Sequence, residues 1–109
     1  MKIEIQDLND GIVILSLEGK LNMLNAPRLR EVIKAKTAAG STRIAIDLSR
    51  VDFIDSSGLG ALINGLKTTR QAGGDLRISK PSEQVKLVLQ LTNVERVLKI
   101  YDFADTAFL

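Results

Sequence analysis

The chain of 109 residues contains no cysteine and no histidine. Without cysteine it cannot form a disulfide, and it has no thiolate for catalysis or metal binding. Without histidine it lacks the general base of Ser-His-Asp and Cys-His sites, the usual imidazole ligand of zinc or copper, and the acceptor of a phosphohistidine relay. We therefore expect a protein that is not an enzyme and that holds no metal and no cofactor.

Aromatic residues and long apolar runs are scarce as well. The chain has three phenylalanines, one tyrosine and no tryptophan, and their spacing does not suit a platform on which nucleic-acid bases stack. Its net charge of +2 gives no strong attraction to nucleic acid. No run of 18 apolar residues predicts a membrane span, and the N-terminus lacks the apolar core of a signal peptide. We expect a cytoplasmic protein without direct nucleic-acid contacts.

The remaining composition is that of an ordinary globular domain. Hydrophobic residues make up 45% of the chain and charged residues 26%, as is typical of domains that bury one core. The length fits one domain spanning residues 1–109, with a real but modest core.

Strands are predicted by alternating or continuous apolar residues. Residues 3–8 alternate, and residues 12–17 form an apolar run after the turn at Asp10 and Gly11, which together predict a hairpin. We expect this hairpin to end at the segment Gly19-Lys20-Leu21-Asn22. Further strands are predicted over residues 43–48, 76–78 and 99–103.

Helices are predicted by apolar residues at intervals of three and four. The first begins after Asn25, has Pro27 in its first turn and ends at Gly40. The second begins at Ser56 or Ser57 and stops at Gly73-Gly74. The third runs from Pro81-Ser82 to Asn93, and Asp105-Thr106 starts a final helical turn.

Strands that alternate with helices in this order indicate an α/β fold. We expect a mixed, mostly parallel sheet of four to five strands, packed with about three to four helices and connected by right-handed crossovers.

The most informative segment is residues 47–60, where a strand runs through a short polar turn into a helix. Ser56 and Ser57 follow Asp55 at the predicted helix start, which carries unpaired N–H groups and a partial positive charge. A serine there is either a plain helix cap or a phosphate acceptor. A cap needs only one hydroxyl. The small residues Gly58 and Gly60 leave the position open to another protein, but they would also permit close packing of the helix on the sheet. The sequence alone leaves both interpretations open.

Enzymatic and nucleotide-binding motifs are missing around these serines. There is no Gly-x-Ser-x-Gly elbow, no Ser-x-x-Lys pair and no phosphate-binding loop of the Walker type. Gly58-Leu59-Gly60 resembles the start of a dinucleotide fingerprint, but Ile63 occupies the position of the third glycine.

Two further features bear on binding. Met23 and Leu24 lie in a predicted loop, and they would suit a protein interface if they are exposed beside Ser56. The basic residues of the first helix are interpreted as a solvated face that offers at most a weak contact to an acidic partner. They are Arg28, Arg30, Lys34 and Lys36.

The order of elements and three motifs resemble the STAS domain, and specifically a free-standing anti-sigma factor antagonist. The motifs are Gly19-Lys20-Leu21-Asn22, the segment from Ile46 to Gly60, and Gly73-Gly74. The resemblance extends from about Ile3 to Phe103. It implies a bacterial protein that binds an anti-sigma factor, which is also a serine kinase, and thereby frees a sigma factor for transcription.

The resemblance also implies a phosphorylation cycle. The kinase would phosphorylate Ser56 with its own ATP and release this chain, a serine phosphatase would reset it, and the chain itself would be a monomer or weak dimer. Ser57 remains the alternative acceptor. Family members often carry an acid at the position of Asn22, which leaves the role of that charge open here. The residues expected to contact the partner are Asn22, Met23, Leu24, Asp55, Ser56, Ser57 and Gly58.

Two other functions fit the same pattern. One is an accessory subunit of a lipid-transporting ABC-type membrane complex, without phosphorylation. The other is a small-ligand or nucleotide-binding module that uses the helix start as an anion site.

Overall fold

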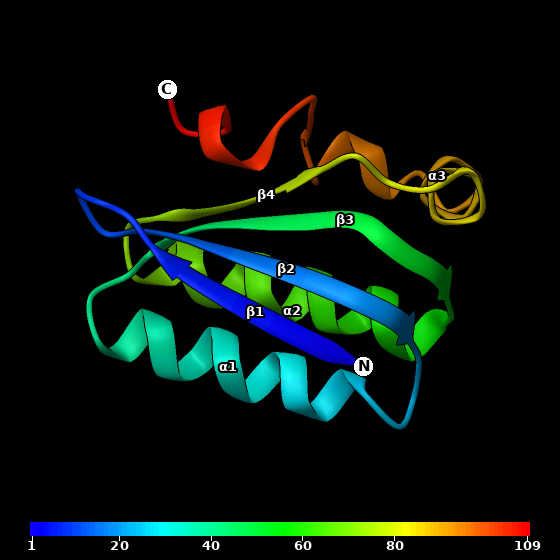
Figure 1. Ribbon diagram of the computed structural model, residues 1–109, viewed down its shortest axis with the longest axis horizontal. Coiled ribbons are helices and arrows are strands. Elements are labelled where there is room, and N and C mark those ends of the chain that lie inside the picture. Colours follow the sequence, from blue (N-terminus) through cyan, green and yellow to red (C-terminus); the bar gives the residue numbers. More distant parts are fainter.

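Five strands form one sheet in the order β1-β2-β3-β4-β5 in the computed structural model, which describes residues 1–109 (Figure 1). Strand β1 is antiparallel to β2, and all other neighbours are parallel. This confirms the predicted α/β fold with a mixed, mostly parallel sheet. In chain order the elements are β1 (Lys2–Asp7), β2 (Ile12–Leu21), α1 (Ala26–Ala38), β3 (Arg43–Ile54), α2 (Ser56–Gln71), β4 (Asp75–Ser79), α3 (Glu83–Leu91), a 3₁₀ turn η1 (Val94–Arg96), β5 (Ile100–Tyr101) and a 3₁₀ turn η2 (Ala104–Thr106).

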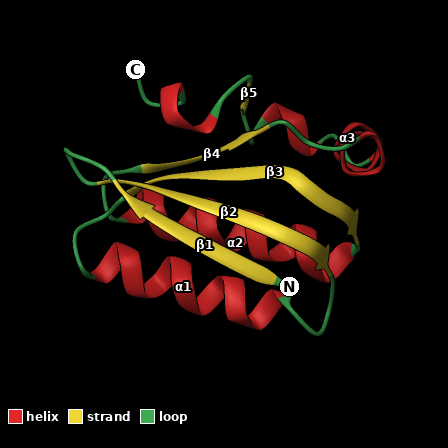
Figure 2. Ribbon diagram, in the orientation of Figure 1, coloured by secondary structure: helices red, strands yellow, loops and turns green.

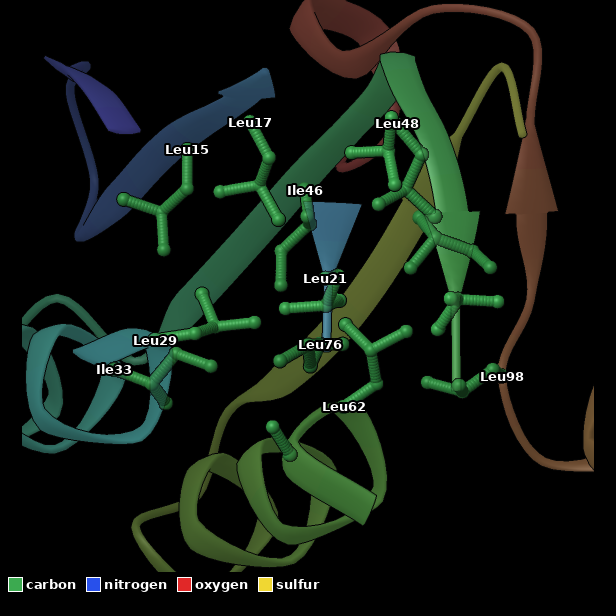
Figure 3. Packing of buried hydrophobic residues seen from close by; sticks show 14 of the residues in the cluster. Leu15, Leu17, Leu21, Leu29, Ile33, Ile46, Leu48, Leu62, Leu76 and Leu98 are labelled. Carbon is green, nitrogen blue, oxygen red and sulfur yellow. The ribbon is translucent and has the colours of Figure 1, made fainter. Parts of the chain in front are cut away.

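Helices α1 and α2 lie side by side against one face of the sheet (Figure 2). Their apolar sides meet the inward residues of β2, β3 and β4 in a cluster of 20 buried residues. Figure 3 shows how Leu29 and Ile33 of α1 and Leu62 of α2 point toward the sheet residues Leu15 and Ile46. Burial of this apolar surface is the main contribution that stabilises the fold. No helix combines the length and hydropathy that crossing a bilayer would require.

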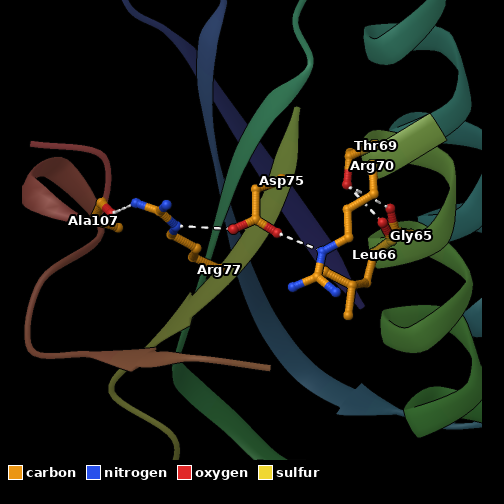
Figure 4. A network of polar contacts seen from close by, with 7 residues as sticks. All are labelled: Gly65, Leu66, Thr69, Arg70, Asp75, Arg77 and Ala107. Carbon is orange, nitrogen blue, oxygen red and sulfur yellow. Dashed lines mark hydrogen bonds and ion pairs between the residues drawn. The ribbon is translucent and has the colours of Figure 1, made fainter. Parts of the chain in front are cut away.

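The opposite face of the sheet is covered in part by the C-terminal segment. Ile14, Ala45 and Ala107 form a small second cluster there. Arg77 of β4 fixes the segment: its Nη1 donates to the Ala107 carbonyl oxygen at 2.6 Å (Figure 4), and its guanidinium lies 4.3 Å from the centre of the Phe108 ring. The C-terminal residues therefore belong to the folded domain.

Strand β3 is longer than the sequence predicts. Its predicted end at residue 48 is wrong, because β3 continues to Ile54 and remains paired there with Leu21 of β2. Strand β2 ends at Leu21, within the segment Gly19-Lys20-Leu21-Asn22 where we expected the hairpin to end. Gly19 adopts a φ of 108° beside a shift in register, a conformation that favours glycine. The predicted polar turn before α2 is therefore wrong, because only Asp55 separates β3 from α2.

Three smaller predictions can also be compared with the structure. Strand β5 is shorter than the predicted residues 99–103. Asn25 precedes α1 as expected but makes no capping bond, since its side-chain amide donates to the Lys20 carbonyl instead. Ser82 does cap α3, and Asn93 follows that helix in the left-handed region with a φ of 58°.

Candidate functional site

The start of α2 is seated directly on the end of β2. Gly58 is buried there, and a Cβ at its position would overlap the Leu21 carbonyl oxygen and lie 2.8 Å from Leu21 Cγ. The Asp55 N–H donates to the same carbonyl oxygen at 3.3 Å. Because the helix start is fixed to the sheet, the residues on its outer side have fixed positions.

Asp55 caps α2. Its Oδ1 accepts a hydrogen bond from the Gly58 N–H at 2.9 Å, and its backbone is extended, as is usual at a helix cap. The interpretation of Ser56 or Ser57 as the cap is therefore wrong. Ser56 is exposed in the first position of α2, and Ser57 is half-buried. Of the two hydroxyls, that of Ser56 is the more accessible to another protein.

The second oxygen of Asp55 holds the loop between β2 and α1. Asp55 Oδ2 accepts a hydrogen bond from the Met23 N–H at 3.0 Å. This bond brings the loop beside Ser56, with the side chains of Met23 and Leu24 left 69% and 81% exposed. Two long apolar side chains exposed next to an exposed serine suit a protein interface better than a small-molecule pocket.

Asn22 shapes the same loop from within. Its Oδ1 accepts hydrogen bonds from the N–H groups of Leu24 and Asn25 at 3.1 and 3.3 Å. A carboxylate oxygen accepts hydrogen bonds in the same way. Asparagine in place of the acid that is frequent in the resembling family therefore preserves the loop and removes only a charge.

Sequence reasoning missed Gln84, which braces the site from α3. Its Oε1 accepts from the Ile54 N–H at 3.0 Å, and its Nε2 donates to the Ile54 carbonyl at 3.4 Å. These bonds fix the last residue of β3, immediately before Asp55. The contact joins positions 30 residues apart, and an ordinary glutamine early in a helix gives no sign of it in the sequence.

The structure brings the expected partner-contact residues together at one end of the sheet. We call the exposed and half-exposed members the α2 start surface, which consists of Asn22, Met23, Leu24, Asp55, Ser56 and Ser57. Gly58, the seventh expected residue, lies buried beneath it, where its lack of a side chain permits the close packing on Leu21.

Removing the Asp55 carboxylate should loosen this surface without unfolding the domain. We expect Asp55→Ala to lower the free energy of unfolding by about 1–2 kcal/mol, since a helix cap is lost. The amide hydrogen of Met23 should also exchange faster with solvent, because it loses its acceptor. Asp52→Ala, at an exposed position of β3, is the matched control. Unchanged Met23 exchange in Asp55→Ala would contradict the assigned role.

Comparison with known proteins places the whole fold in one family. The family model of the STAS domain matches residues 5–107. A Thermotoga maritima protein, provisionally named as an anti-sigma factor antagonist, is 39% identical over 99 residues, which cover 90% of this chain and 88% of that protein. A crystal structure of a Thermotoga maritima protein with the same provisional name has a TM-score of 0.88 at 35% identity, covering 96% of this chain and 90% of that one.

A more distant relative shares the fold alone. The anti-sigma factor antagonist SpoIIAA in its unphosphorylated form has a TM-score of 0.77 at 21% identity, covering 96% of this chain and 92% of that one. Its phosphorylated form has a TM-score of 0.75 at 20% identity, covering 96% of each chain. The family match over nearly every residue and the close relatives agree with the architecture described above, and the chain belongs to the STAS domain family.

Proposed function

We propose that this chain is an anti-sigma factor antagonist whose affinity for its partner is controlled by phosphorylation of Ser56. The observation that carries the proposal is the division of roles at the start of α2. Asp55 caps the helix, so the exposed hydroxyl of Ser56 is not needed as a cap and is available for modification. The names of the STAS relatives support the same role.

The partner that fits the α2 start surface is an anti-sigma factor with serine kinase activity. The exposed side chains of Met23 and Leu24 provide apolar contact area, and Ser56 lies beside them. ATP would be bound by the kinase, and a serine phosphatase would restore the binding form. The chain itself acts as a regulatory binding protein of the bacterial cytoplasm and performs no catalysis.

The switch needs no change of fold. A phosphate adds about −1.5 to −2 charges at neutral pH, and it would stand next to the Asp55 carboxylate on the α2 start surface. In the complex that charge would lose water and face the partner directly. A cost of about 3 kcal/mol weakens binding roughly a hundredfold. SpoIIAA, which shares this fold, has been solved in both unphosphorylated and phosphorylated forms. This supports the proposal that the fold can carry a phosphate without changing.

Site-resolved mass spectrometry of the protein isolated from its own cells, with and without phosphatase treatment, tests the proposal. We expect phosphate on Ser56 that the phosphatase removes, that is lost in Ser56→Ala and that persists in Ser57→Ala. The second variant is the matched control, because it removes the neighbouring hydroxyl only. Phosphate confined to Ser57 would move the switch by one residue. No phosphate in any growth condition would count against a phosphorylation switch and favour the transporter-subunit or ligand-binding function.

A further inference from the structure

A groove between α1 and α2 begins at Ser56 and carries positive charge. It has a volume of about 430 Å³, and its lining includes Ser56, Gly60, Arg30 of α1 and Lys67 of α2. No acidic residue lines it. The first position of α2 therefore opens on one side to the α2 start surface and on the other side to a basic groove.

Arg30 lies over α2 at the turn that follows Ser56. One of its terminal nitrogens, Nη2, is 3.2 Å from the point that a Cβ on Gly60 would occupy. Gly60 comes four residues after Ser56, so it lies on the same side of the helix and about 6 Å farther along its axis. The missing side chain of Gly60 is what allows the guanidinium to approach the helix here.

The guanidinium of Arg30 is also available. Among the other basic residues of α1, Arg28 donates to the Met1 carbonyl oxygen and Lys36 pairs with Asp7. Arg30 takes part in none of the ion pairs of the chain. Lys34 is exposed like Arg30 but does not line the groove. Arg30 is thus the cation of α1 that takes part in no ion pair and lines the same groove as Ser56.

A phosphate on Ser56 would be stabilised further by such a cation. The Asp55 carboxylate already accepts the Gly58 N–H, so that donor of the helix start is not available to the phosphate. It would also repel the phosphate from the adjacent position. A guanidinium binds phosphate oxygens through two parallel hydrogen bonds. An arginine side chain is long enough to cover the distance of one helical turn once the phosphate extends from Ser56.

We propose that Arg30 binds the phosphate of phosphorylated Ser56 within the same chain and so bridges α1 to the start of α2. Lys67 adds to the positive potential of the groove. The pairing offsets repulsion from Asp55 and holds the modified side chain in one orientation. This inference deepens the proposed function and rests on Ser56 as the phosphorylated residue.

The test uses protein with phosphoserine installed genetically at position 56 and a ³¹P NMR titration of its phosphate. Three chains are compared: the parent, Arg30→Gln, and Lys34→Gln, which removes one exposed charge of α1 outside the groove. We expect the second pKa of the phosphate to be lower in the parent and in Lys34→Gln than in Arg30→Gln, because a nearby cation favours the dianion. The difference should shrink as salt is added.

Equal phosphate pKa values in all three proteins, or an equal rise in both variants, would overturn the pairing. Superimposable amide spectra of the unphosphorylated proteins would show that the fold is intact, as expected for changes at exposed side chains. Arg30→Lys, which keeps the charge and loses the planar fork, should give an intermediate value. The titration requires no kinase and no partner. A negative result would therefore refute the Arg30 pairing without refuting the proposed function. The proposed function would be refuted separately, by the absence of phosphate on Ser56 in cells.

Discussion

Gly58→Ala is expected to destabilise the domain more than any other single-methyl addition on α2. Alanine is favoured over glycine within a helix by about 1 kcal/mol. The added Cβ would nevertheless overlap the Leu21 carbonyl oxygen and press on Leu21 Cγ at 2.8 Å. Both groups are fixed, because Leu21 is fully buried at the end of β2. The start of α2 must therefore move away from the sheet, and we expect a net loss of about 2 kcal/mol or more.

Urea denaturation of Gly58→Ala and Gly60→Ala measures this effect with a matched control. Gly60 lies two residues farther along the same helix, and its added Cβ would meet only the end of the flexible Arg30 side chain at 3.2 Å. Gly60→Ala should be neutral or stabilising by up to about 1 kcal/mol. Equal stability of the two variants would show that α2 does not depend on its close packing on Leu21.

The sequence predicted the order and type of the elements because their patterns are local. The apolar run at residues 12–17 and the helical spacing that includes Leu62 and Leu66 depend only on neighbouring residues. The same holds for Ser82, whose side chain caps α3 as its position suggests.

The end of β3 could not be predicted in this way. Its last residues are held by pairing with β2, where Ile54 lies opposite Leu21, 33 positions earlier in the chain, and by a register shift beside Gly19. Gly19 resembles a terminator when only its neighbours are considered. In the fold it is the residue that lets the strand continue, because its φ of 108° suits glycine.

The candidate site shows the same limit. The pair Ser56-Ser57 was found from sequence because it follows an acid at a predicted helix start, and Met23 and Leu24 were found because they are apolar residues in a predicted loop. The role of Gln84 and the bond from the Met23 N–H to Asp55 were not found, since each joins residues 30 or more positions apart. The capping bond of Asp55 is local, because it reaches only to Gly58, and an aspartate directly before a predicted helix was the signal that could have found it. Local patterns thus identified the serine pair, whereas the long-range contacts that position it became apparent only in three dimensions.

Ser56→Asp is expected to leave the fold intact and to weaken binding of the anti-sigma factor about a hundredfold, which corresponds to roughly 3 kcal/mol. An acidic side chain in the first turn is compatible with the positive end of a helix, and position 56 is exposed. The loss in affinity arises in the complex, where the new charge is removed from water beside Asp55. Isothermal titration with the purified partner, together with circular dichroism of the free variant, measures both effects.

Two control variants separate charge at this position from general disturbance of the surface. Ser56→Ala removes the hydroxyl without adding charge, and it should bind within a fewfold of the parent, because Asp55 and not Ser56 caps the helix. Ser57→Asp adds the same charge one residue later, at a half-buried position that faces the surface less directly, and should weaken binding by less than Ser56→Asp. Undiminished affinity of a well-folded Ser56→Asp would refute electrostatic control at this residue. A larger loss in Ser57→Asp, with the fold retained, would assign the switch to Ser57 instead.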